Sequence, residues 1–183
     1  MGWGSTKTRV AAMIAALVAA FWCLSGPASA ETKSALSLEE LEQVLIDAGL
    51  DPEMTSDAKT GAPVAKAEFG SLIFWIRALD CDRDGCSTLM LFSNFDLDRP
   101  ITADDLRTIN RYNDSNVFGR AYALEKRGEV GVDYVIELDG GVSLENVTRN
   151  ISRWADVMAA FIENFQEGPP ALDDSEEDAL IGS

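Results

Sequence analysis

The chain has 183 residues, among them 15 lysines and arginines, 31 aspartates and glutamates and no histidine, which gives a formal net charge of −16. The missing histidine excludes a Ser-His-Asp triad, a Cys-His pair and imidazole metal ligands. The acidic excess disfavours nucleic-acid binding because it repels phosphate backbones, and a content of 46% hydrophobic and 25% charged residues is typical of a globular domain.

Residues 1–30 have the pattern of a secretory signal peptide. A short basic start precedes the almost wholly apolar run 10–24, and no acid occurs before residue 31. The small residues Ala28 and Ala30 predict cleavage after Ala30. An uncleaved anchor is the alternative, although the run is shorter than the about 20 residues of a spanning helix. We therefore expect a periplasmic or secreted chain with no membrane segment after cleavage.

The mature chain is predicted to begin with a helix and four strands. Ser37 and Glu40 form a capping box, and apolar residues at helical spacing follow until Gly49. The predicted strands are 54–57, 64–69, 72–79 and 89–92.

The third and fourth of these strands are apolar on both faces. Such strands are usually central and covered on both sides. If helices cover only one side, the other face is expected to meet a partner. Trp75, Met90 and Phe92 are then the candidate contact residues.

Cys81 and Cys86 flank a turn that joins the same two strands. Export places both cysteines in an oxidising compartment, and the intervening Asp-Gly pair favours a tight turn. We expect a disulfide, with free thiols as the alternative. The four-residue spacing does not fit a thioredoxin-like motif, which has two residues between its cysteines.

The same turn resembles the start of a calcium-binding loop. Asp80, Asp82 and Asp84 occupy the first ligand positions, but such a loop needs a glutamate at position 12, where this chain has Leu91. We therefore expect no metal site and no cofactor, and keep a calcium-responsive module as an alternative.

A second helix and a hairpin are predicted in the following segment. Thr102 caps a helix that runs to about Arg111, with Leu106 and Ile109 pointing inward. The hairpin pairs two strands. In the second strand, 130–138, apolar and polar residues alternate, which predicts one buried and one solvent-exposed face. Its wet face is predicted to carry Asp133, Glu137 and Asp139.

A long last helix is predicted to extend to about Gln166. Its apolar residues recur in steps of three and four: Leu144, Val147, Ile151, Trp154, Met158, Phe161 and Phe165. We favour packing of this stripe on the sheet. The alternative is that Trp154 and Phe161 serve a subunit interface. The domain is thus expected over 31–166, followed by an acidic, disordered tail over 167–183 that is solubilising or serves docking.

Sequence motifs of catalysis are missing: the chain has no Walker loop, no G-x-S-x-G and no dinucleotide fingerprint. Acid pairs such as Asp96 with Asp98, or Glu137 with Asp139, leave a carboxylate-dependent hydrolase as an alternative. We expect no enzyme.

Several motifs together resemble the YbjN-domain family of bacterial proteins. They are INRYN over 109–113, FGRAY over 118–122, the strand 130–138 and GGVS over 140–143, within a similarity that spans 37–165. The resemblance implies an α+β fold like that of type III secretion chaperones, a twisted antiparallel sheet with helices packed on it, in the order α-β-β-β-β-α-β-β-α. It also implies a sensory-transduction regulator with no catalytic residues to assign.

The interpretation is an exported, non-enzymatic binding, chaperone-like or regulatory module. Its expected partner is a protein or peptide, with a homodimer as one form and with no nucleic acid.

Overall fold

A computed structural model describes residues 32–169. The predicted signal peptide, the cleavage site and nearly all of the acidic tail lie outside these residues. The described helices are α2 (Leu38–Asp47), α3 (Ala103–Ser115) and α4 (Leu144–Glu167). None of the helices between residues 32 and 169 combines the length and the apolar character needed to cross a membrane.

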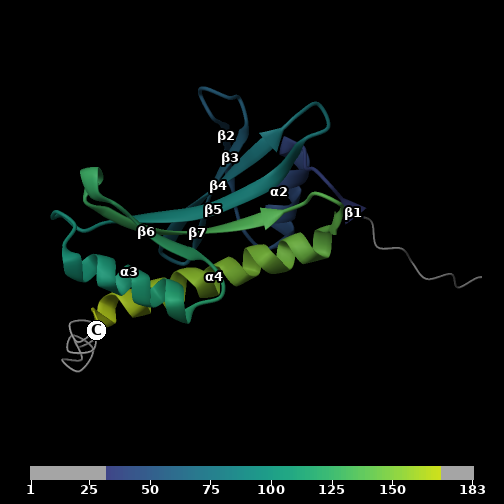
Figure 1. Cartoon of the computed structure of the whole chain (residues 1–183). Helices are drawn as coiled ribbons and strands as arrows, with labels where there is room; N and C mark the ends of the chain where they lie inside the picture. The colour runs from purple at the N-terminus through teal and green to yellow at the C-terminus, as the bar shows by residue number, and fades with distance from the viewer. Residues whose placement is uncertain (1–31, 170–183) are drawn as a thin grey trace, which may run out of the picture. The chain divides into compact units, whose positions relative to one another are not determined.

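Six strands form one antiparallel sheet in the order β2-β3-β4-β5-β7-β6 (Figure 1). They are β2 (Glu53–Ser56), β3 (Pro63–Phe69), β4 (Leu72–Cys81), β5 (Cys86–Asp96), β6 (Arg120–Leu124) and β7 (Glu129–Glu137). Short β1 (Thr32–Lys33) pairs with β8 (Val142–Ser143), and the 3-10 helix η1 (Glu125–Arg127) lies between β6 and β7. The α+β prediction is confirmed, and the elements follow the expected order apart from these three short additions.

Local capping explains where α2 and α3 begin. Ser37 accepts a hydrogen bond from the Glu40 backbone N–H (3.2 Å) and Glu40 accepts one from the Ser37 backbone N–H (2.9 Å), which confirms the predicted capping box. The hydrogen bond that the Glu40 carboxylate accepts from the Ser37 backbone N–H lowers the pKa of Glu40, and so does the interaction of this carboxylate with Lys33. Thr102 and Asp105 form an equivalent box at α3.

The inward face of α3 differs from the prediction at one position. Ile109 is 6% exposed as expected, but Leu106 is 39% exposed. The buried stripe of α3 runs through Asp105, Thr108 and Tyr112, at helical spacing, and Leu106 lies beside that stripe. The prediction that Leu106 points inward was wrong because the buried positions include polar residues that hydropathy alone does not select.

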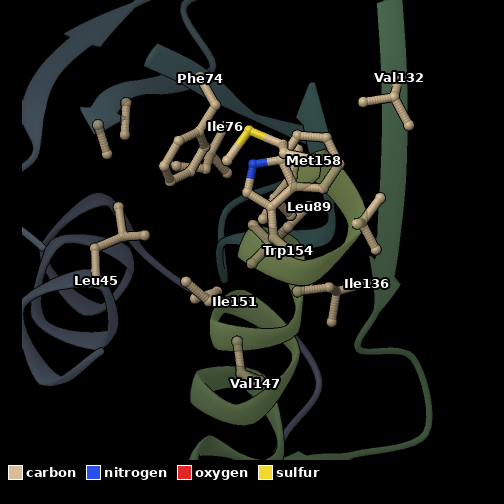
Figure 2. Packing of buried hydrophobic residues seen from close by; sticks show 14 of the residues in the cluster. Leu45, Phe74, Ile76, Leu89, Val132, Ile136, Val147, Ile151, Trp154 and Met158 are labelled. Atoms are coloured by element: carbon tan, nitrogen blue, oxygen red, sulfur yellow. The ribbon is translucent and has the colours of Figure 1, made fainter. Parts of the chain in front are cut away.

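The core lies between the sheet and α4. Trp154 of α4 points into a cluster that includes Phe74, Ile76 and Leu89 from the strands, and α2 contributes Leu45 (Figure 2). The rings of Trp154 and Phe74 meet edge to face with centroids 6.1 Å apart.

The two α4 aromatics that were alternative interface candidates are part of this core. Trp154 is 0% and Phe161 2% exposed, and Phe161 packs edge to face on Tyr112 at 5.5 Å. This placement corrects the subunit-interface alternative, because the sheet and α3 already cover both side chains.

Cys81 and Cys86 are joined by a disulfide and are directly opposite each other in the register of β4 and β5. Asp82 and Gly85 close the turn through a 2.8 Å backbone hydrogen bond. Gly85 has a φ of 130°, and a Cβ there would lie 2.7 Å from the Leu36 backbone, which pairs with Cys86. The glycine therefore lets the N-terminal segment approach the bridged hairpin.

Candidate binding face of the sheet

Side chains of β4 and β5 alternate between two faces of the sheet that differ in burial. On the face that packs against the helices, Phe74, Ile76 and Leu91 are each at most 1% exposed. On the opposite face, Ile73 is 47% and Trp75 37% exposed. Because no helix among residues 32–169 buries these side chains, we call this second side of the sheet the open face.

Five apolar side chains gather at the centre of the open face, and together we call them the open-face patch: Ile73, Trp75, Met90, Phe92 and Val135. The register places Trp75 opposite Phe92, and Met90 opposite Val135. Val135 is 50% exposed, while Met90 and Phe92 are half-buried. The structure thus brings together the three residues that sequence analysis selected for partner contact.

A basic residue, Arg77, lies within this apolar surface. The register places it opposite Met90, and its guanidinium lies 5.6 Å from the centroid of the Phe92 ring, a cation–π geometry. Its buried Nε atom has no hydrogen-bond partner. Within the described part of the chain Arg77 makes no hydrogen bond or close ion pair. The Asp57 carboxylate lies within its electrostatic reach: hydrogen bonds from the Thr60 and Lys59 backbone N–H groups lower the pKa of Asp57, and the charge of Arg77 contributes to the same shift.

One margin of the open face is formed by an ion pair across β6 and β7. The Arg120 guanidinium donates two hydrogen bonds to the Asp133 carboxylate, at 2.5 and 3.3 Å, and this carboxylate raises the pKa of Arg120. Asp133 is only 7% exposed, because Phe92 and Arg120 flank it in the register. Asp133 therefore lies on the predicted strand face but is not exposed to solvent there, whereas Glu137 and Asp139 are exposed.

Tyr122 lies beside that ion pair. Its hydroxyl donates a 2.6 Å hydrogen bond to Asn94, and burial raises its pKa to about 12. A Cβ at Gly131 would lie 2.7 Å from the Tyr122 ring and 2.5 Å from the Asn94 side chain. Only a residue without a Cβ at position 131 of β7 therefore leaves room for the Tyr122 ring.

The segment over 113–122 closes one edge of the sheet. Asn113 accepts a hydrogen bond from the Ala121 backbone N–H (2.8 Å) and donates one to the Ala121 carbonyl oxygen (3.1 Å). The Asn113 amide thus satisfies the backbone N–H and carbonyl groups of Ala121 on the edge strand β6, where a neighbouring strand would otherwise bind. The motif residues Asn113, Arg120 and Tyr122 have structural roles in the sheet.

The three aspartates of the disulfide turn are not gathered around one point. Asp80 accepts a hydrogen bond from the Thr88 hydroxyl (2.9 Å), and Asp82 accepts one from the Asp84 backbone N–H (2.8 Å). In the segment 32–169, no three histidine, cysteine, aspartate or glutamate side chains are placed to hold a metal ion.

The predicted acid pairs are also engaged locally. Asp96 accepts a hydrogen bond from the Asp98 backbone N–H (2.8 Å), and Glu137 accepts one from the Asp139 backbone N–H (3.4 Å). Thr88 brings Glu137 near Asp80 instead, a proximity that the sequence does not reveal.

Sequence reasoning missed three features of the open face: Ile73, Val135 and the position of Arg77. Ile73 was detectable, because it shares the strand face of Trp75. Val135 was missed because it lies on the strand face that the sequence analysis assigned to the acids Asp133, Glu137 and Asp139. The environment of Arg77 depends on strand register, which a single sequence does not specify.

Comparisons with known proteins give one finding. A family model named YbjN, described as "Putative bacterial sensory transduction regulator", matches residues 37–167. Searches of the curated proteins and of the solved structures returned no match. The likeness to type III secretion chaperones therefore stays a prediction. The matched residues include every strand of the six-stranded sheet and all three described helices, and the chain belongs to the YbjN family.

Proposed function

We propose that this chain is an exported, non-enzymatic binding module that holds a protein or peptide partner on its open face, in a regulatory or chaperone-like role in the periplasm. The observation that carries the proposal is the open-face patch. Monomeric soluble proteins rarely expose large contiguous apolar patches, and those that occur often mark interaction sites. Membership of a family described as "Putative bacterial sensory transduction regulator" agrees with a binding role.

The chemistry of this face suits an extended polypeptide. Trp75 and Phe92 offer rigid aromatic surface, and Met90 offers an adaptable thioether side chain. Arg77 adds one donor group able to bind a carboxylate or a backbone carbonyl. A polypeptide lying across the strands would contact apolar and basic groups together.

Site-specific photocrosslinking in cells tests the proposal. Ile73→benzoylphenylalanine and Val135→benzoylphenylalanine place the probe on the open face, at side chains that are 47% and 50% exposed. Ile46 and Leu106 are 48% and 39% exposed on the helices and provide matched controls. We expect discrete adducts from the open-face probes and none from the helix probes.

Adducts from all four positions, or from none, would contradict the proposed surface. An adduct of twice the chain mass would identify a second copy as the partner.

Export is tested separately. The chain recovered from the periplasmic fraction is expected to begin at Glu31 by mass spectrometry. Recovery of the whole chain in the cytoplasm would contradict export without bearing on the open face.

A further inference from the structure

One row of cross-strand neighbours on the open face has a charge pattern that reverses from end to end. We call it the central row, and from β2 to β6 the register places in it Glu53, Lys66, Trp75, Phe92, Asp133 and Arg120. Two aromatic residues form its middle, and one acid and one cation form each end. The outer charge is negative at the β2 end and positive at the β6 end, and the inner charges have the opposite signs.

Each end of the central row is an ion pair whose outer member is the accessible one. Lys66 lies 3.4 Å from Glu53, and the Glu53 side chain is 76% exposed. Arg120 lies 2.5 Å from Asp133, and the Arg120 side chain is 72% exposed. The open face therefore presents an accessible negative charge at one edge and an accessible positive charge at the other.

A row with this pattern is complementary to itself. A two-fold axis parallel to the strands, midway between β4 and β5, turns the open face of a second copy toward the first and reverses its strand order. β2 then faces β6 of the second copy, β3 faces β7, and β4 faces β5. In the central row Glu53 consequently faces Arg120 of the second copy, and Lys66 faces Asp133 of the second copy.

The other acids of the open face meet no acid in this arrangement. The register places Glu68 of β3 and Glu137 of β7 on the same face. Glu68 faces Gly131 of the second copy, and Glu137 faces the start of β3. Asp96 and Glu129, at the end of the sheet, face the uncharged turn between β3 and β4 of the second copy.

The middle of the face supplies apolar contacts. Trp75 faces Phe92 of the second copy, and in the adjacent row Val64 faces Val135. Arg77 faces Met90 of the second copy, so this cation meets no cation. Stacked sheets pack about 10 Å apart with their strands about 30° apart. Long side chains such as Glu53 and Arg120 can span the offset that this angle produces at the sheet edges.

The size of the open face suits a stable dimer. Six strands spaced about 4.8 Å apart and the seven residues of β3 at about 3.4 Å each give a face of about 29 by 24 Å, or about 700 Å². A standard protein interface buries about 800 Å² on each partner. The accessible area of a surface with protruding side chains exceeds its flat outline, so one sheet face is sufficient.

We propose that the partner held on the open face is a second copy of this chain, packed face to face about a two-fold axis parallel to β4 and β5. The inference rests on the proposed function, because it names the partner of the same surface. The open-face patches of both copies form the centre of the interface, and two four-charge networks close its ends.

Swapping one ion pair separates contacts between copies from contacts within a chain. The swap variant carries Glu53→Lys and Lys66→Glu, which keeps a pair within each chain and conserves the net charge. It also places a cation opposite Arg120 of the second copy and an acid opposite Asp133 of the second copy. The matched control, Glu145→Arg with Arg149→Glu, swaps an exposed 2.8 Å ion pair on α4.

Sedimentation velocity over a range of concentrations measures the dissociation constant of each purified protein. We expect the unmodified chain to form a dimer that dissociates on dilution, and the swap variant to associate about tenfold more weakly, because like charges then face each other across the interface. The difference should shrink in about 1 M salt, which screens attraction and repulsion alike. The control should behave like the unmodified chain.

The Val135 photocrosslinking probe locates the contact. An adduct of twice the chain mass should map by mass spectrometry to β3, near Val64, because β7 faces β3 in the proposed dimer. Mapping to β7 or to a helix would overturn the face-to-face arrangement.

A purified chain that stays monomeric at every concentration would overturn the inference, as would a dimer that the swap leaves unchanged. A monomeric chain whose Ile73 and Val135 probes capture a different protein would overturn the inference and leave the proposed function intact. Absence of both self-association and open-face adducts would contradict both.

Discussion

Both faces of the β4–β5 pair carry large apolar side chains, but the two faces differ in what covers them. On the covered face Phe74 and Leu91 are 0% exposed, whereas on the open face Trp75 keeps 37% of its surface accessible. The same two strands therefore support a core on one side and an accessible surface on the other. Apolar residues on both faces of a strand indicate that both faces pack against other groups. Residues 32–169 provide such packing for the covered face but not for the open face.

The largest loss of stability is expected on substitution of Trp154, the α4 side chain that packs against the covered face. Trp154→Ala is expected to lower the free energy of unfolding by about 3–5 kcal/mol, because it leaves a cavity beneath the sheet. Urea denaturation followed by circular dichroism measures the loss. Trp154→Phe is the matched control and should cost less, since the buried indole N–H has no hydrogen-bond partner within the described residues. A loss below about 1 kcal/mol for Trp154→Ala would contradict the covered face as the core.

The disulfide joins the two strands that both faces share. Cys81→Ser with Cys86→Ser should lower the free energy of unfolding by about 2 kcal/mol on the chain-entropy model, because the closed loop is short. The unmodified chain under reducing conditions should show the same loss in urea denaturation. An unchanged stability in both would show that the strand pairing alone fixes the hairpin.

The anchoring of α3 on the covered side is expected to depend on pH. Arg99 donates hydrogen bonds of 2.6 and 2.8 Å to Asp105, and together with the Thr102 cap this holds the pKa of Asp105 well below its usual range. The ionised form is thus favoured in the folded state, so its stabilisation is present above the unfolded pKa of about 4 and is lost as the pH falls further.

Asp105→Asn should therefore cost about 2 kcal/mol at pH 7, and the difference from the unmodified chain should shrink below about pH 4. Urea denaturation of both proteins across pH 3–7, with Asp104→Asn as a control, measures this. A difference that stays constant with pH would contradict the assigned role of the carboxylate.

The sequence predicted the elements where local rules dominate. Ser37 with Glu40 and the stripe through Trp154 identified α2 and α4, because capping and helical spacing act within one turn or along one helix. The open face was inferred from Trp75, Met90 and Phe92 because the two strands that carry them are apolar on both faces, and alternate side chains of a strand point to opposite sides of the sheet.

Predictions failed where distant residues decide the outcome. The burial of Asp133 depends on Arg120 and Phe92, which lie on two other strands. The surroundings of Arg77 likewise depend on which residues the register places beside it, and a single sequence does not reveal that register.

The smallest effect on stability is expected on the open face. Trp75→Thr keeps a residue with high strand propensity and removes only a half-exposed indole and its cross-strand contact with Phe92, so the free energy of unfolding should change by less than about 1 kcal/mol. The measurement is the same urea denaturation used for Trp154→Ala. If the proposed function is correct, this variant loses its photocrosslinks at position 73 while remaining folded. A loss comparable to that of Trp154→Ala would instead mean that Trp75 is part of a second core, with the open face closed in the folded protein.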